Sequence, residues 1–141
     1  MSGLLELLNP YPSVLLLILR VVVGGLLAVH GYRKVAGGRV HSEQLMTRMG
    51  MPPVVADLVT LLELVGGIFL VVGLLTPLAG LLFALEFGGV ILMKSSKMQA
   101  KLIAAEPGKP SYETEVLFLL LALVFLFMGA GAYSLDRLIG L

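Results

Sequence analysis

The chain has 141 residues, of which 58% are hydrophobic and 13% are charged, and its mean hydropathy is +1.01. These values lie far from those of soluble globular domains, and a formal net charge of +1 gives no reason to expect a nucleic-acid partner. The chain has no cysteine and only two histidines. It therefore lacks the ligands for an iron–sulfur cluster, a thiolate metal site or a haem held by two internal axial ligands.

Four continuous apolar stretches, each able to cross a bilayer, occupy most of the chain. Continuous rather than alternating hydrophobicity indicates helices, because only helices and closed barrels span lipid. No stretch remains that is long enough for a soluble domain. We therefore predict one all-α domain over residues 1–141, an integral membrane, antiparallel four-helix bundle with spans at about 13–36, 54–75, 78–93 and 115–132.

The connection after the first span is predicted to contain a short amphipathic helix. Gly37 and Gly38 should end the span, and Ser42 in the segment HSEQLMTRMG is a plausible N-cap, with Gly50 as the stop. An apolar face would be shared by Leu45, Met46 and Met49. We expect this helix to lie at the membrane surface.

The remaining connections are short. Thr76-Pro77 is predicted to form a tight hairpin between the second and third spans, residues 107–110 a turn, and residues 133–136 a polar cap after the last span. The third helix is predicted to continue as a basic face that reaches toward the interface, formed by Lys94, Lys97 and Lys101.

Basic residues are distributed asymmetrically between the two sides. The opposite side has only Arg137, whereas the connections 33–53 and 94–114 hold eight basic residues: Arg33, Lys34, Arg39, Arg48, Lys94, Lys97, Lys101 and Lys109. Cytoplasmic loops carry the excess of Lys and Arg. We therefore predict a protein of the cytoplasmic membrane with both loops in the cytoplasm and both termini outside.

Small residues recur inside the spans. Gly80, Ala84 and Gly88 are spaced by four on the third span, a pattern that lets helices approach closely. Further glycines predicted to serve helix packing are Gly24, Gly31, Gly66, Gly67, Gly73 and Gly89. The glycines beside Glu63 could instead leave room for a flat ligand.

Three charged side chains lie deep within the spans, where an unpaired charge costs several kcal/mol. At a helical rise of about 1.5 Å per residue, Arg20, Glu63 and Glu86 lie about 11 to 14 Å from the nearer boundary. They should therefore meet at one level. We predict that Arg20 pairs with Glu63, and that desolvation leaves Glu86 protonated as the titrating group.

A polar line is predicted from this level to the cytoplasmic surface. On the first helix it would run from Arg20 past His30 to Lys34, and at the surface it would meet Glu113 and Glu115. Such residues form proton relays. They also form ion pairs that specify helix register without any chemistry, and both interpretations remain open. The methionines are interpreted as packing residues, and we predict no metal site.

Four segments carry a resemblance to a known family. These are LILRVVVGGLLAVHGYRKVAGG, MGMP, ELVGGIFLVVGLLTPLAG and GAGAYSLD, in this order over nearly the whole chain. Together they resemble the DoxX family of small four-helix membrane proteins. The resemblance implies a link to quinone-linked thiosulfate oxidoreductase subunits, although other relatives are described as accessory or assembly proteins.

The resemblance also implies site residues. Ser134 and Asp136 match the terminal motif, and the patterns of the first two helices are matched by Arg20, His30, Gly31, Lys34, Glu63, Gly66 and Gly67. Glu86 departs from the family pattern, since many relatives have methionine or another apolar residue there. Its role therefore cannot be transferred from the family.

Two functions from different classes remain. The first is a membrane subunit of a quinone-linked redox system, in which Arg20 or His30 would hydrogen-bond a quinone carbonyl and Glu63 or Glu86 would supply protons. It would need a redox partner, because the chain has no internal redox centre. The second is a non-catalytic accessory or assembly subunit of a larger membrane complex, or a homo-oligomer. A small transporter is disfavoured, because broken helices and an inverted repeat are not evident.

Overall fold

The computed structural model describes residues 12–48 and 50–140. Within these ranges all regular secondary structure is helical. The isolated β-bridge between Lys101 and Ser111 belongs to no strand. The elements in chain order are α2 Pro12–Arg33, η1 Lys34–Gly38, α3 Arg39–Arg48, α4 Pro53–Leu61, η2 Leu62–Gly66, α5 Gly67–Val72, α6 Thr76–Lys97, α7 Glu113–Met128 and α8 Leu135–Leu138.

Three helical segments are long and apolar enough to cross a membrane: Ser13–Arg48, Pro53–Val72 and Thr76–Lys97. They confirm the all-helical membrane character. Helix α7 has 16 residues, and at about 1.5 Å per residue it is shorter than a bilayer core of about 30 Å. The fourth span therefore stays a prediction.

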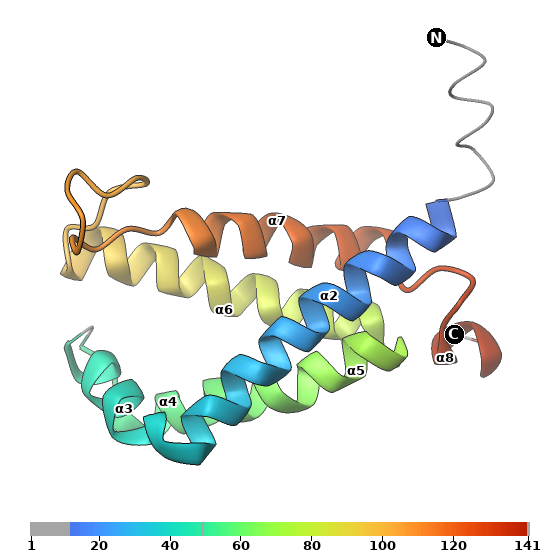
Figure 1. Cartoon of the computed structure of the whole chain (residues 1–141), viewed down its shortest axis with the longest axis horizontal. Coiled ribbons are helices and arrows are strands. Elements are labelled where there is room, and N and C mark those ends of the chain that lie inside the picture. The colour runs from blue at the N-terminus through green and yellow to red at the C-terminus, as the bar shows by residue number, and fades with distance from the viewer. Residues whose placement is uncertain (1–11, 49, 141) are drawn as a thin grey trace, which may run out of the picture.

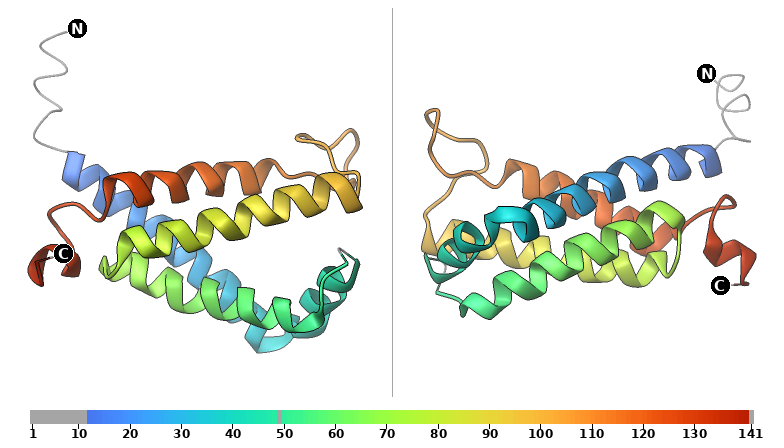
Figure 2. Two further views of the ribbon diagram at one scale, coloured as in Figure 1. Left: turned by 180° about the vertical axis from the view of Figure 1, so that it is seen from behind. Right: turned by 60° about the horizontal axis from the view of Figure 1, so that its bottom comes forward.

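The helices form two packed groups (Figures 1 and 2). Helices α6 and α7 run side by side along their length, and α2 crosses the continuous helix formed by α4, η2 and α5. Residues from all four segments share one core, which includes Val23, Leu27, Leu70, Ala79, Phe83, Phe87, Ala122 and Phe125. Phe87 stacks on Phe83 and Phe118, with centroid distances of 6.2 and 5.2 Å. This aromatic column lies within the core that the two groups share.

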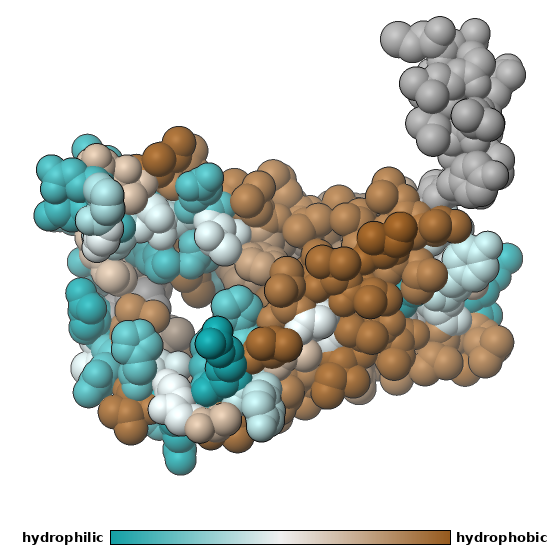
Figure 3. Space-filling view, viewed as in Figure 1, coloured by the Kyte–Doolittle hydropathy of each residue, from teal (hydrophilic) through white to brown (hydrophobic). Residues whose placement is uncertain are grey.

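The outer surface is largely apolar. Large exposed side chains occur along each long helix, among them Leu15, Leu58, Leu85, Leu120 and Phe127. Figure 3 shows apolar residues over most of the visible face, with polar residues gathered at the end formed by α3 and the α6–α7 connection. Such a surface is stable only against lipid or another apolar surface.

The turn between α5 and α6 differs from the predicted Thr76-Pro77 hairpin. It comprises residues 73–75, and Thr76 and Pro77 already belong to α6. Gly73 (φ 76°) and Leu75 (φ 49°) both have left-handed backbone conformations. The prediction failed because proline is well suited to the first helical turn, while Gly73 supplies the sharp reversal.

The first connection also differs from its predicted form in detail. The chain bends at Gly37 (φ 154°), and α3 begins at Arg39 rather than after Ser42. Ser42 is not the N-cap, because its hydroxyl group lies inside the helix and donates to the carbonyl oxygen of Gly38 at 3.0 Å. The buried Met46 of α3 packs against Ala56 of α4.

Two further expectations concern the ends of these helices. Helix α6 ends at Lys97, so Lys101 lies in the following loop and does not extend the helical basic face. Met49, the third member of the predicted apolar face of α3, lies outside the described residues. A position of α3 at the membrane surface remains a prediction.

Candidate functional site

Arg20 is fully buried, and it does not pair with Glu63. Its Nη1 donates to the carbonyl oxygen of Leu70 at 3.2 Å, and its Nη2 donates to that of Tyr133 at 2.5 Å. The predicted pairing was wrong because depth alone does not determine direction. The guanidinium of Arg20 points to the turn between α5 and α6, where backbone carbonyls accept its hydrogen bonds and the carboxylate of Asp136 adds a favourable electrostatic interaction.

Asp136 closes the same end of the molecule. Its two carboxylate oxygens accept hydrogen bonds from the backbone N–H groups of Leu75 at 2.6 Å and Thr76 at 2.9 Å. Its own N–H donates to the carbonyl oxygen of Gly73 at 2.9 Å. The segment 133–136, which we name the C-terminal clasp, thus caps α6, whose first N–H groups have no partner within the helix.

Gly73 explains why the clasp fits so closely. A Cβ atom at this position would collide with the guanidinium of Arg20 and lie 2.5 Å from the Cβ of Ser134. The hydrogen bonds at this end join α2 and the C-terminal clasp to backbone groups of the chain, including those of the turn between α5 and α6. This end is separate from the second polar cluster.

The second cluster begins with an ion pair between Lys34 and Glu63. Lys34 Nζ lies 2.9 Å from Glu63 Oε2, and their side chains are 27% and 8% exposed. Glu63 lies in η2, a wide helical turn at residues 62–66 between two regular helices. Such π-helical turns are rare and occur often at functional sites.

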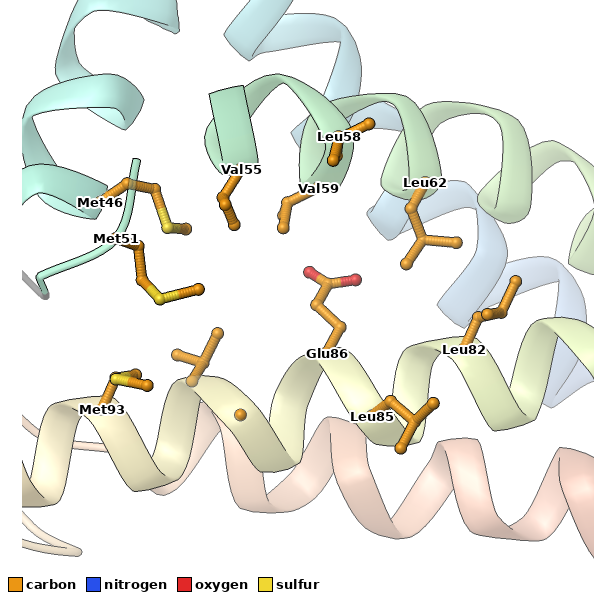
Figure 4. A pocket seen from close by; sticks show the side chains of 12 residues that line it. Met46, Met51, Val55, Leu58, Val59, Leu62, Leu82, Leu85, Glu86 and Met93 are labelled. Carbon is orange, nitrogen blue, oxygen red and sulfur yellow. The ribbon is translucent and has the colours of Figure 1, made fainter. Parts of the chain in front are cut away.

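Glu86 belongs to this cluster and also lines a cavity. Figure 4 shows its carboxyl group pointing from α6 toward α4, between apolar side chains. The cavity, which we name the Glu86 cavity, has a volume of about 340 Å³ and is lined by Met46, Met51, Val55, Leu58, Val59, Leu62, Leu82, Leu85, Glu86, Gly89, Val90 and Met93. Among the described residues, Glu86 is the one charged member of this lining.

The carboxyl group of Glu86 is incompletely satisfied. Its Oε2 is buried and has no hydrogen-bond partner among the described residues. Glu63 and Lys34 both interact with it electrostatically, so Lys34, Glu63 and Glu86 form one polar chain. A buried polar atom without a partner is costly. It marks a position where a ligand or water could bind.

The other predicted site residues lie apart from the cluster of Lys34, Glu63 and Glu86. His30 and Glu113 are exposed, and Glu115 pairs with Lys94 at 2.6 Å. The single polar line predicted from Arg20 to Glu115 is therefore divided into three: the Arg20 end, the Lys34–Glu63–Glu86 chain, and the Lys94–Glu115 pair.

The small residues serve several contacts. A Cβ atom on Gly24 or Gly31 would lie 2.6 Å from the backbone of the helix formed by α4, η2 and α5, and one on Gly80 would lie 2.6 Å from the backbone N of Leu126. Gly67 meets α2 equally closely, Gly66 lies against Phe83, and Ala84 packs against the core. Gly88 has open space around it in the described part of the chain, with nothing within 4 Å of where a Cβ atom would lie.

Two features of the site were not predicted from the sequence. Arg39 donates to both carboxylate oxygens of Asp57, at 3.0 and 3.1 Å. The methionines Met46, Met51 and Met93, interpreted only as packing residues, gather at one side of the Glu86 cavity. Asp57 near the start of an apolar helix was a usable signal, because a charge there requires a partner. The scattered methionines offered none.

Comparisons with known proteins identify a family and one curated relative. The DoxX family model matches residues 15–94. The chain is 32% identical over 122 residues to "Putative oxidoreductase CatD" of Bacillus subtilis (strain 168), and the match covers 85% of this chain and 83% of that protein. No solved structure matches the chain significantly.

Proposed function

The chain belongs to the DoxX family, and from this premise we propose that it is a membrane component of a redox system. Its role is to bind a quinone-like, lipid-soluble ligand in the Glu86 cavity. The similarity to a protein named as an oxidoreductase supports the redox link. With no cysteine and two histidines, the chain would work with a partner that carries the electrons.

The Glu86 carboxyl group in an otherwise apolar cavity is the observation that carries this proposal. Ligand sites are mostly apolar, with a few polar groups that orient the ligand. A volume of about 340 Å³ lies at the lower end of the range for small-molecule sites, about 300 to 1,000 Å³. It suits the ring of a quinone, whose tail would continue into lipid.

The residues present fit such a ligand chemically. A quinone ring offers carbonyl oxygens that accept hydrogen bonds, and Glu86 Oε2 is a buried atom without a partner among the described residues. In its protonated form Glu86 would donate a hydrogen bond to a quinone carbonyl. The negative charge beside it would be that of Glu63, which pairs with Lys34. The quinone would supply the redox chemistry, while this chain binds it, orients it and supplies a proton.

Two adjacent glycines allow a sharp test. Gly89 lines the cavity and Gly88 does not, and a Cβ atom at either position would have no neighbour within 4 Å among the described residues. Leucine at either position should therefore be accommodated by the helix, but only Gly89→Leu fills the space before Glu86. We expect Gly89→Leu to abolish binding of a short-chain benzoquinone or naphthoquinone, measured by tyrosine fluorescence quenching and thermal shift in micelles.

The matched variant and an isosteric variant complete this experiment. Gly88→Leu should retain the affinity of the natural chain, and Glu86→Gln should weaken it about threefold to tenfold, the range for one hydrogen bond to a polar group. Equal quinone affinity in all four proteins, or no saturable binding, would refute the proposed ligand site.

A second candidate function is an accessory subunit that packs against other membrane helices. It is favoured by Gly25 and Gly88, whose small surfaces have open space around them in the described ranges. Small residues on lipid-facing helices are typical of helix–helix interfaces. Loss of a stoichiometric partner on Gly25→Leu or Gly88→Leu, with quinone affinity unchanged, would favour this function.

The proposed topology places α7 as a fourth span, with residues 129–132 completing the crossing. Loops 33–53 and 94–114 would face the cytoplasm, as their eight basic residues suggest. Both termini would then lie outside. Labelling of single cysteines introduced at Arg48 and Arg137 by an impermeant reagent in sealed cells should mark only the second.

A further inference from the structure

A second cavity lies beside the helix formed by α4 and η2, on the face opposite to the one that lines the Glu86 cavity. It has a volume of about 340 Å³ and is lined by four polar residues, Lys34, Arg39, Asp57 and Thr60, and by the apolar Val35, Leu61 and Leu64. We propose that this cavity, which we name the inlet cavity, is the route by which protons from the aqueous phase reach Glu86. The proposal rests on the proposed role of Glu86 as the proton donor to a ligand.

Helical geometry separates the two cavities. The Glu86 cavity receives residues 55, 58, 59 and 62 of this helix, and the inlet cavity receives residues 57, 60, 61 and 64. Each set follows the i, i+3, i+4, i+7 spacing of one helix face. The sets differ by two positions, or about 200° at about 100° per residue. The cavities therefore lie on opposite faces of one helix.

Glu63 lies between these faces. It follows Leu62, which lines the Glu86 cavity, and precedes Leu64, which lines the inlet cavity. Its carboxylate binds Lys34, a residue of the inlet cavity, and interacts with Glu86, a residue of the opposite cavity. Lys34 and Glu63 thus connect two spaces that the helix otherwise separates.

The polar side chains of the inlet cavity lie at increasing depth. Arg39 binds Asp57 through two hydrogen bonds and lies 3.0 Å from Glu43, and the side chains of Arg39 and Asp57 are 67% and 38% exposed. Lys34 is partly exposed, whereas Glu63 is buried. Exposure thus falls step by step from Arg39 to Glu63, as expected for an aqueous entrance that ends at a buried acid.

The transfer involves protons alone. A proton carried by water in the inlet cavity adds to the carboxylate of Glu63, whose O–H then donates it to the carboxylate of Glu86. Glu63 is left ionised and is again stabilised by the ammonium group of Lys34. Lys34 is a positioning residue in this scheme, because it holds Glu63 toward the inlet cavity without contacting the ligand.

Cysteine accessibility tests whether the inlet cavity is aqueous, and the absence of natural cysteine makes the experiment clean. Thr60→Cys and Leu64→Cys should react with a charged, membrane-impermeant methanethiosulfonate reagent. Val65→Cys is the matched control, since Val65 is 40% exposed at the same depth but does not line the cavity. Equal reactivity at positions 64 and 65, or none at 60 and 64, would overturn the proposal.

Hydrogen–deuterium exchange of the Glu86 carboxyl band, followed by infrared spectroscopy of reconstituted protein, tests the route itself. Glu86→Gln should remove the band, which assigns it. Glu63→Gln and Lys34→Met should slow exchange about tenfold or more, whereas Lys34→Arg should restore the rate. Unchanged exchange in Glu63→Gln, or no band removed by Glu86→Gln, would contradict the route.

The two proposals fail in different ways. If Gly89→Leu leaves quinone affinity unchanged while Glu63→Gln slows exchange, the ligand is wrong and the inlet cavity stands. If Gly89→Leu abolishes quinone binding but Glu63→Gln leaves the exchange rate of Glu86 unchanged, the ligand site is supported and protons reach it by another path.

Discussion

Lys34 Nζ lies 2.9 Å from Glu63 Oε2, and this pair links the end of the first long helix to the middle of the second. Gly31 lies about one turn before Lys34 and packs against the backbone of Leu64, so the two helices touch where the pair forms. The ion pair therefore reports on close helix packing as well as on charge. Removing either partner tests both.

Lys34→Met should destabilise the protein by about 3 kcal/mol, because it leaves a buried carboxylate without its cation. Adding Glu63→Gln should restore much of the loss. The measurement is a double-mutant cycle on unfolding in mixed micelles. Additive effects of the two substitutions would show that the pair is not formed.

Asp136→Ala should lower the free energy of unfolding by about 2 kcal/mol. The substitution removes both acceptors for the first N–H groups of α6 and frees Leu75 from the contact that holds its left-handed conformation. Asp57→Asn is the control, since that pair is exposed and its loss should cost less than about 1 kcal/mol. Equal losses in thermal unfolding would contradict the role of the clasp.

Arg20→Met should also destabilise, by about 2 to 4 kcal/mol, because the carbonyl group of the buried Leu70 and the carbonyl group of Tyr133 both lose their donor. Quinone affinity at a temperature where the variant is folded should be unchanged, since Arg20 does not line the Glu86 cavity. A selective loss of affinity with normal stability would place Arg20 in the ligand site instead.

Gly80→Val should separate α6 from α7, because a Cβ atom at Gly80 would lie 2.6 Å from the backbone N of Leu126. Gly88→Val, on the same helix but with open space around it among the described residues, should be tolerated. Protease resistance of the α6–α7 connection in micelles compares the two. Similar resistance in both variants would refute the close packing of these helices.

The apolar pattern was sufficient to predict the all-helical membrane fold and the approximate bounds of its long helices. Continuous hydrophobicity leaves few alternatives in lipid. The bend at Gly37 and the stop at Gly50 also followed from local chemistry. The turn at Gly73 did not, because Thr76-Pro77 is equally compatible with the beginning of a helix, which is what it forms.

The charged residues show the limit of reasoning from depth. Arg20, Glu63 and Glu86 were expected to meet, and only the two glutamates interact. A long arginine side chain can donate its hydrogen bonds to backbone carbonyls near a turn. Residue spacing does not show which distant segment will lie beside it. The partner of Glu63 is Lys34, about four helical turns beyond Arg20.

Photoaffinity labelling would locate a bound quinone on the chain. A quinone with an azido group on its ring, irradiated with the reconstituted protein and mapped by mass spectrometry, should label residues 51–62 and 85–93, which face each other across the Glu86 cavity. Excess unmodified quinone and Gly89→Leu should both prevent labelling. Labelling confined to the apolar groove between Ile18 and Leu121, or equal labelling of Gly89→Leu, would contradict a ligand site at Glu86.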